Sequence, residues 1–157
     1  FKQKTAYEIK ECDWSSDVCS SDLPLRCMTG LVFSGCVKKY PEIRWIFCHA
    51  GGALAPMVER IIRQAAHDKA LNERMPEGPL PYFRSFHYDI ATSASPDNLG
   101  VLLRHVPVTQ VLFGLDMPFV DATPTLRNFG RNGFTDDQTR AIEAGNALKL
   151  FPRFAAI

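Results

Sequence analysis

Apolar and polar positions follow one another along this chain in the patterns of short buried strands and amphipathic helices. Segments 43–48, 85–90 and 111–115 are rich in β-branched and aromatic residues, which predicts three strands. Around them, apolar residues recur at helical spacing, which predicts helices over 28–40, over 54–71, from Ser95-Pro96 onward, and from Thr135 to about Leu150. Strands that alternate with helices in this way predict a parallel sheet.

Polar side chains follow the first and the third of these strands. The strings CHAGG and GLDMPF place His49 and Asp116 at strand carboxyl ends, where α/β barrels keep their chemistry. The predicted fold class is therefore α/β, and three strands are too few for a closed barrel, so we expect the back part of one. The alternative for Asp116 is a helix N-cap or a loop aspartate, and the alternative for His49 is a buried core histidine.

Composition narrows the choice of partners. The chain has 157 residues, of which 46% are hydrophobic and 22% charged, with a net charge of +1. This is the composition of one ordinary soluble domain. It has neither a long apolar run nor a basic excess, so we expect no membrane and no nucleic acid as partner. Five cysteines without a CxxC spacing favour reduced thiols and a cytoplasmic location.

The first 23 residues differ from the rest of the chain. They have neither helical nor strand periodicity and lack the apolar segment of a signal peptide. Their back-translation fits two stretches of a common sequencing-library index adapter around a short variable index. We therefore expect residues 1–23 to be an adapter-derived, disordered segment and residues 24–157 to be the natural sequence. The alternative is a natural tail rich in Ser and Asp.

Further polar residues near the predicted strands have more than one interpretation. Alternation along a strand directs His87 and Asp89 to the same face. Two roles are open for Asp89, support of the site or a turn at the strand end. We expect His67, late in its helix, to be solvated. Cys48 is expected to be a small buried thiol.

Three stretches of the sequence resemble one known enzyme family. FSGCVKKYPEIRWIFCHAGGALAPMVERI (33–61) is similar to the sixth-strand region of amidohydrolase-superfamily proteins of the aromatic-acid decarboxylase group. FHYDIATSASPDNLGVLLRHVPVTQVLFGLDMPF (86–119) is similar to their seventh and eighth strands, and GNALKLFPRF (145–154) to their terminal helix. The segments ATSASP and RHVPVTQVLFG resemble the 6-methylsalicylate decarboxylase-like branch most.

The resemblance implies a (β/α)8 barrel, of which this chain holds about the sixth to eighth strands. It also implies one divalent metal, zinc in most members and manganese in some. The family's ligands are a first-strand acid or His-x-His motif, a fifth-strand histidine and an eighth-strand aspartate. By motif match, Asp116 is that aspartate and a candidate proton donor, and His49 is the sixth-strand histidine that orients water or substrate. Met117 stands where many relatives have tyrosine, and a homodimer is the suggested assembly.

The implied metal site lacks ligands in this chain, because no histidine precedes His49. For the parent enzyme we expect metal-dependent decarboxylation of a small aromatic or conjugated carboxylic acid. A metal-dependent hydrolase of lactones, amides or esters on the same barrel is one alternative. A chimeric fragment without activity is the other, and it is what we expect of the isolated chain. Asp116 and His49 alone fall short of the three protein ligands that a catalytic zinc needs.

Overall fold

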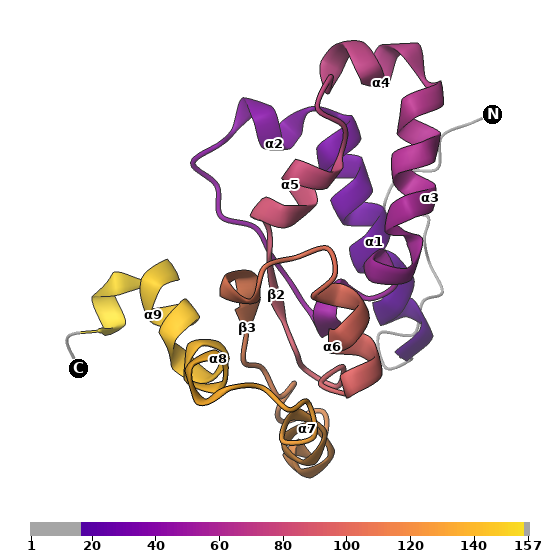
Figure 1. The fold of residues 1–157 in the computed structure, drawn as a ribbon. Helices are drawn as coiled ribbons and strands as arrows, with labels where there is room; N and C mark the ends of the chain where they lie inside the picture. The colour runs from indigo at the N-terminus through magenta and orange to yellow at the C-terminus, as the bar shows by residue number, and fades with distance from the viewer. Residues whose placement is uncertain (1–16, 156–157) are drawn as a thin grey trace.

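A small parallel sheet lies at the centre of the computed structural model, which describes residues 17–155 and the side chains from Leu23 onward (Figure 1). Its strands are β1 (Ile46–Phe47), β2 (His87–Asp89) and β3 (Val111–Leu112). They lie in the order β1-β2-β3, and both neighbouring pairs are parallel. The predicted sheet type is therefore confirmed, although each strand is shorter than its apolar segment.

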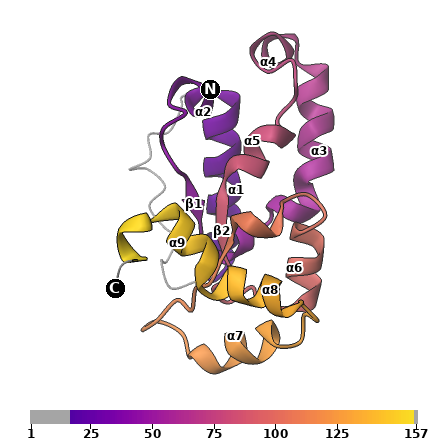
Figure 2. The ribbon, with the colours of Figure 1, turned by 60° about the vertical axis from the view of Figure 1, so that its left-hand side comes forward.

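Helices make up most of the regular structure in this part of the chain. The α-helices are α1 (Asp17–Phe33), α2 (Cys36–Lys39), α3 (Leu54–His67), α4 (Lys69–Arg74), α5 (Leu80–Ser85), α6 (Pro96–Leu102), α7 (Ala122–Phe129), α8 (Asp136–Arg140) and α9 (Asn146–Leu150). Short 3-10 turns cover His49–Gly51, Val108–Gln110 and Pro152–Phe154, and a π-helix covers Ala141–Gly145. Figures 1 and 2 show α4 and α7 at opposite ends of the molecule. Among the described residues, no helix has the length and apolar character needed to cross a lipid bilayer.

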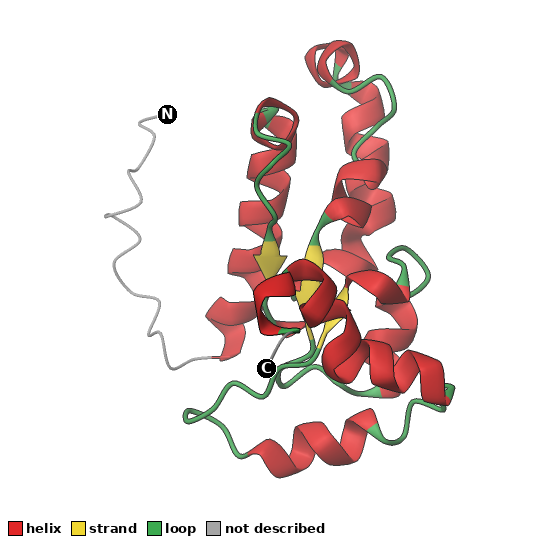
Figure 3. Ribbon diagram, turned by 90° about the vertical axis from the view of Figure 1, so that its left-hand side faces the viewer, coloured by secondary structure: helices red, strands yellow, loops and turns green. Residues whose placement is uncertain are grey.

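The core lies between the sheet and the helices that surround it (Figure 3). Tyr88, in the middle of β2, is fully buried, whereas His87 and Asp89 on either side are half-buried. Because side chains alternate across a strand, Tyr88 faces the core and His87 and Asp89 share the opposite face, as predicted. Met28 and Val32 bring α1 into the same core. The half-buried face of β2, opposite the core, is therefore the face whose polar side chains can contact a ligand.

Two of the predicted helices are divided in the structure. The helix expected over 28–40 is split between α1 and α2, because Gly35 at the junction has a φ of 77°. The helix expected over 54–71 ends with α3, and α4 begins after Asp68. The carboxylate of Asp68 accepts the backbone N–H of Leu71 at 3.0 Å, and this N-cap starts the new helix.

Helix α1 begins inside the segment that was expected to be disordered. It starts at Asp17 and runs through Pro24, the expected first natural residue. Met28 and Val32 hold its second half in the core, and a helix that is already nucleated extends at little cost. The expectation of disorder therefore does not hold from Asp17 onward, and residues 1–16 lie outside the described part of the chain. The adapter origin stays a prediction.

The outer edge of β3 is closed by the C-terminal helices. Asn146, the first residue of α9, donates from Nδ2 to the carbonyls of Val108 and Val111 at 2.9 and 2.8 Å. The N–H of Phe113 donates to the carbonyl of Ile142, in the π-helix, at 3.0 Å. Backbone groups at a strand edge are thereby satisfied without a further strand.

Candidate active site

The carboxyl ends of the three strands lie at one edge of the sheet, because the strands are parallel. Cys48 and His49 follow β1, Asp89 ends β2, and Asp116 follows β3. The structure thus places both residues predicted from the sequence, His49 and Asp116, in turns after strands that end at the same edge. Asp89, for which two roles were open, lies on the strand between them.

The chain turns sharply after β1, through four successive residues with positive φ. His49, Ala50, Gly51 and Gly52 have φ values of 56°, 54°, 74° and 57°. For the two residues that are not glycine, this left-handed conformation is unfavourable, so surrounding contacts must hold it. One such contact is made by the backbone N–H of His49, which donates to Oδ1 of Asp89 at 3.1 Å.

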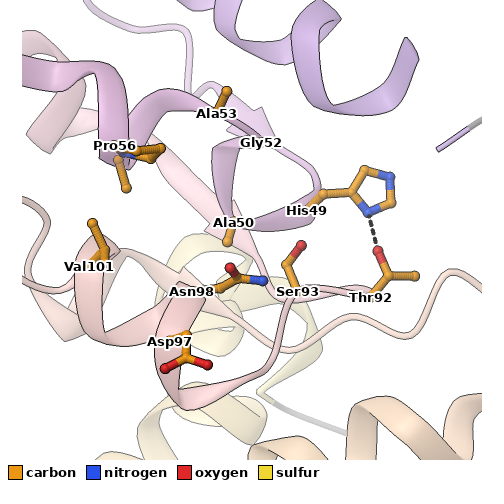
Figure 4. Close-up of a pocket in the computed structure, with 11 residues that line it drawn as sticks. His49, Ala50, Gly52, Ala53, Pro56, Thr92, Ser93, Asp97, Asn98 and Val101 are labelled. Atoms are coloured by element: carbon orange, nitrogen blue, oxygen red, sulfur yellow. Dashed lines mark hydrogen bonds between the residues drawn. The ribbon is translucent and has the colours of Figure 1, made fainter. Parts of the chain in front are cut away.

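The imidazole of His49 is held by the turn that follows β2. Its Nδ1 lies 3.0 Å from the carbonyl oxygen of Ala91 and 3.0 Å from Oγ1 of Thr92 (Figure 4). A carbonyl can only accept a hydrogen bond, so the contact with Ala91 requires the proton on Nδ1. In the neutral ring, Nε2 then carries the lone pair and is the nitrogen available to a ligand.

Asp116 occupies a tight turn after β3, with a φ of 62°. Its carbonyl accepts the N–H groups of Phe119 and Val120 at 3.0 and 3.2 Å. The side chain is half-buried, and no donor in the described part of the chain bonds its carboxylate. The helix N-cap considered for Asp116 is instead Asp121, whose carboxylate accepts the N–H of Thr123 at 2.9 Å at the start of α7. The Asp116 carboxylate is therefore open to a cation or a proton.

Asp89 packs between the turn after β1 and the end of β3. In addition to the N–H of His49, its Oδ1 accepts the N–H of Ala91 at 3.0 Å. Gly114 lies directly against it, and a Cβ at position 114 would stand 3.1 Å from both Cβ and Cγ of Asp89. Both roles left open for Asp89 are thus present in the structure: it closes its own strand-end turn and it contacts the His49 backbone.

The thiol of Cys48, next to His49, is influenced by the charges of two carboxylates. Partial burial raises the pKa of this thiol, the charge of Asp89 raises it further, and the charge of Asp116 adds to the effect. The expectation of a buried thiol is wrong, because the Cys48 side chain is exposed. Like Ile46, which is 43% exposed, it alternates onto the sheet face opposite the core.

A cavity of about 610 Å³ opens beside His49, between the first residues of α3 and those of α6. Its apolar wall comes from Ala50, Ala53, Ala55, Pro56 and Val101, and its polar rim comes from Thr92, Ser93, Asp97 and Asn98. Figure 4 shows the His49 ring turned toward Thr92 and away from Pro56 and Val101. The cavity is large enough for a small molecule, and His49 is among the residues that line it.

The described residues do not form a complete metal site. Among those with described side chains, no three His, Cys, Asp or Glu residues come together closely enough to hold a metal ion. A catalytic zinc usually has three protein ligands. Asp116 offers one open carboxylate, and on this geometry the described residues alone do not fit a bound divalent metal.

The other histidines near the sheet and the helices are placed differently. His67 is exposed at the end of α3, as predicted. His87 is half-buried at the start of β2, and burial lowers the pKa of its imidazole, with the charge of Arg44 lowering it further. The Nδ1 atom of His87 is buried without a partner among the described residues. His87 therefore lies on the same face as Asp89 but at the amino end of the strand, away from the candidate site.

Comparison with known proteins identifies the family. A family model described as amidohydrolase matches residues 4–153. The chain belongs to the amidohydrolase family. The resemblance found in the sequence is thereby confirmed, and so is the fold class, since this amidohydrolase chain also superimposes on solved amidohydrolase structures.

Two curated relatives of this amidohydrolase chain are decarboxylases. It is 30% identical over 137 residues to decarboxylase yanB of Aspergillus niger, covering 82% of the chain and 37% of that protein. It is 31% identical over 135 residues to the 6-methylsalicylic acid decarboxylase of Penicillium expansum, covering 84% of the chain and 42% of that protein. The chain thus spans about two fifths of the length of the curated relatives it matches.

A solved structure with the same fold is the dihydroxybenzoic acid decarboxylase of Polaromonas sp. JS666, with bound manganese and the inhibitor 2-nitroresorcinol. It matches with a TM-score of 0.67 at 24% identity, over 84% of this chain and 39% of that one. This likeness shows that the β/α units of the amidohydrolase chain correspond to part of an α/β barrel.

Proposed function

We propose that this chain forms part of the active site of a metal-dependent decarboxylase that acts on a small aromatic or conjugated carboxylic acid. One observation carries the proposal. Among the described residues, neither Nε2 of His49 nor the carboxylate of Asp116 has a hydrogen-bond partner, and both residues follow strands that end at the same sheet edge in an amidohydrolase fold. The activities of the relatives support the reaction class, because 6-methylsalicylic and dihydroxybenzoic acids are aromatic carboxylic acids.

The reaction needs a proton at the ring carbon that bears the carboxylate. Once that carbon is protonated, its bond to the carboxylate breaks, CO2 leaves, and the bonding electron pair restores the aromatic ring. In this proposal the Asp116 carboxyl group holds and delivers the proton. Nε2 of His49 accepts a hydrogen bond from a substrate hydroxyl or from water, and so orients the molecule that it contacts.

We further propose that the whole protein uses one divalent cation and that Asp116 is the ligand supplied by this chain. Such a cation would hold the substrate carboxylate and offset its charge. Manganese in the Polaromonas enzyme supports a divalent ion, and zinc is what the sequence resemblance implies. Because the described residues complete no metal site, the other ligands belong, in this proposal, to a part of the protein outside residues 17–155.

The proposal is tested by measuring CO2 release from 6-methylsalicylate and 2,6-dihydroxybenzoate, with zinc or manganese added. The isolated 157-residue chain is expected to release none. The full-length protein encoded by the uninterrupted reading frame that carries residues 24–157 is expected to release CO2. In that protein, His49→Ala is expected to reduce the rate of CO2 release. His67→Ala, at an exposed position, is the control and is expected to leave the rate unchanged. Hydrolysis of a lactone without any CO2 release would contradict the proposal.

A further inference from the structure

We propose that Asp89 is a positioning residue of this site, which sets the imidazole of His49 so that its proton is on Nδ1. The catalytic benefit of this proton position rests on the proposed function. The proton position itself does not depend on that function, and it can be measured in the isolated chain.

A single carboxylate oxygen ties together the two turns that meet at the imidazole. Oδ1 of Asp89 accepts the N–H of His49 at 3.1 Å and the N–H of Ala91 at 3.0 Å. The carbonyl of Ala91 lies 3.0 Å from Nδ1 of His49. The contacts therefore form a closed ring, which runs from Asp89 through the His49 backbone and imidazole to Ala91 and back to Asp89.

The charge of Asp89 makes this ring strong. Hydrogen bonds from backbone N–H groups to an ionised carboxylate are shorter and about twice as strong as neutral ones. They offset the unfavourable left-handed backbone of His49, which has a φ of 56°. An asparagine would keep an acceptor oxygen in the place of Oδ1, while it loses the charge and carries an NH2 group in place of Oδ2. An alanine would leave both N–H groups unpaired.

Gly114 confines the Asp89 side chain from the opposite direction. A Cβ at position 114 would stand 3.1 Å from Cβ and Cγ of Asp89 and 3.2 Å from Oδ1. The nearest atoms include the oxygen that bonds His49, so a change at position 114 pushes on the ring of contacts without removing any of its members.

The location of the proton decides what the imidazole offers to a substrate. With Nδ1 protonated and bonded to Ala91, Nε2 is an acceptor. A neutral imidazole without constraints prefers its proton on Nε2, where it would be a donor. Loss of the Asp89 contact therefore reverses the direction of the hydrogen bond that His49 can make at the site.

The experiment is a nitrogen-15 NMR measurement of the His49 ring in the 157-residue chain, at a pH where the imidazole is neutral. The two ring nitrogens have separate shifts that show which one carries the proton. Wild type and Asp89→Asn are expected to hold the proton mainly on Nδ1, and Asp89→Ala mainly on Nε2. Thr92→Val, which removes the hydroxyl 3.0 Å from Nδ1 and leaves the Ala91 carbonyl, is the matched control and is expected to match wild type.

The outcomes separate this proposal from the proposed function. A folded Asp89→Ala chain with the proton still on Nδ1 would overturn it, as would a wild-type chain with the proton on Nε2. If Asp89→Ala does not fold, the same measurement on Gly114→Ala decides. A shift of the His49 proton toward Nε2 supports the role of Asp89, and a proton that stays on Nδ1 contradicts it. None of these results depends on CO2 release. The proposed role of Asp89 can therefore be contradicted while the decarboxylase proposal stands, and the decarboxylase proposal can be contradicted while the role of Asp89 stands.

Discussion

Gly114 lies so close to the Asp89 side chain that a Cβ at position 114 would stand 3.1 Å from two of its carbon atoms. Contacts this short require the Asp89 side chain to shift by a few tenths of an ångström. Gly114→Ala is therefore expected to lower the free energy of unfolding by about 1–3 kcal/mol, the usual cost of overpacking. Urea denaturation of the two chains measures this difference.

Gly100 is the matched control for that substitution. It lies in α6, and a Cβ there would meet nothing within 4 Å. Gly100→Ala is expected to leave stability unchanged or to raise it by about 0.5–1 kcal/mol, because alanine is the better helix residue. Equal effects of the two substitutions would show that Gly114 and Asp89 are not in close contact.

The second prediction concerns the closed edge of β3. Asn146 is buried, and its Nδ2 bonds two carbonyls, those of Val108 and Val111. Asn146→Ala leaves both carbonyls without this donor, so we expect a loss of about 1–3 kcal/mol in the free energy of unfolding. Asn98→Ala, at an exposed position on α6, is expected to change it by less than about 0.5 kcal/mol. If Asn146→Ala left the free energy of unfolding unchanged, α9 would not close this edge.

The third prediction uses Cys48 as a probe of the Asp116 carboxylate. The pKa of this thiol is raised first by partial burial, then by the charge of Asp89, and also by that of Asp116. Since a nearby negative charge opposes the thiolate, Asp116→Asn should lower the pKa and move alkylation of Cys48 by iodoacetamide to lower pH. Asp97→Asn on α6 serves as the control. If the pH profile of Cys48 stayed the same in Asp116→Asn, the two side chains would not be neighbours.

The fourth prediction concerns pH and His87. Burial, and then the charge of Arg44, lower the pKa of its imidazole from the ordinary 6.5 in the folded chain. The unfolded chain thus binds the proton at higher pH than the folded chain, so stability falls as the pH drops through this range. His87→Gln should therefore reduce the loss of stability between about pH 7.5 and about pH 5.5. Urea denaturation at both pH values tests this, with His67→Gln as the exposed control. If His87→Gln lost as much stability between the two pH values as the wild type, the prediction would be contradicted.

Strands and the polar residues after them were accessible from the sequence, because they depend on local patterns. Runs of β-branched and aromatic residues marked all three strands, and the residues after them included His49 and Asp116. The breaks in the helices were harder to foresee. Gly35 has the freedom to end a helix, and Asp68 has the side chain to cap one, yet apolar periodicity continues across both. Helices α5 and α7 were not predicted, because prolines lie in or shortly before both.

The contacts that hold the candidate site could not be derived in this way. The bond from the His49 backbone to Asp89 joins residues that are 40 positions apart. The acceptor of the imidazole is the carbonyl of Ala91, and a backbone carbonyl has no signature in the sequence. A glycine beside an aspartate on a neighbouring strand, as Gly114 lies beside Asp89, becomes visible only once the register of β2 and β3 is known.

The metal content of the complete protein tests the central claim most directly. If Asp116 is the ligand that this chain supplies, the wild-type protein should bind one zinc or manganese ion per chain. The same protein with Asp116→Ala should lose that ion, while Asp97→Ala, an exposed carboxylate on the rim of the cavity, keeps it. An Asp116→Ala protein that is folded and retains its full metal content would contradict the assignment.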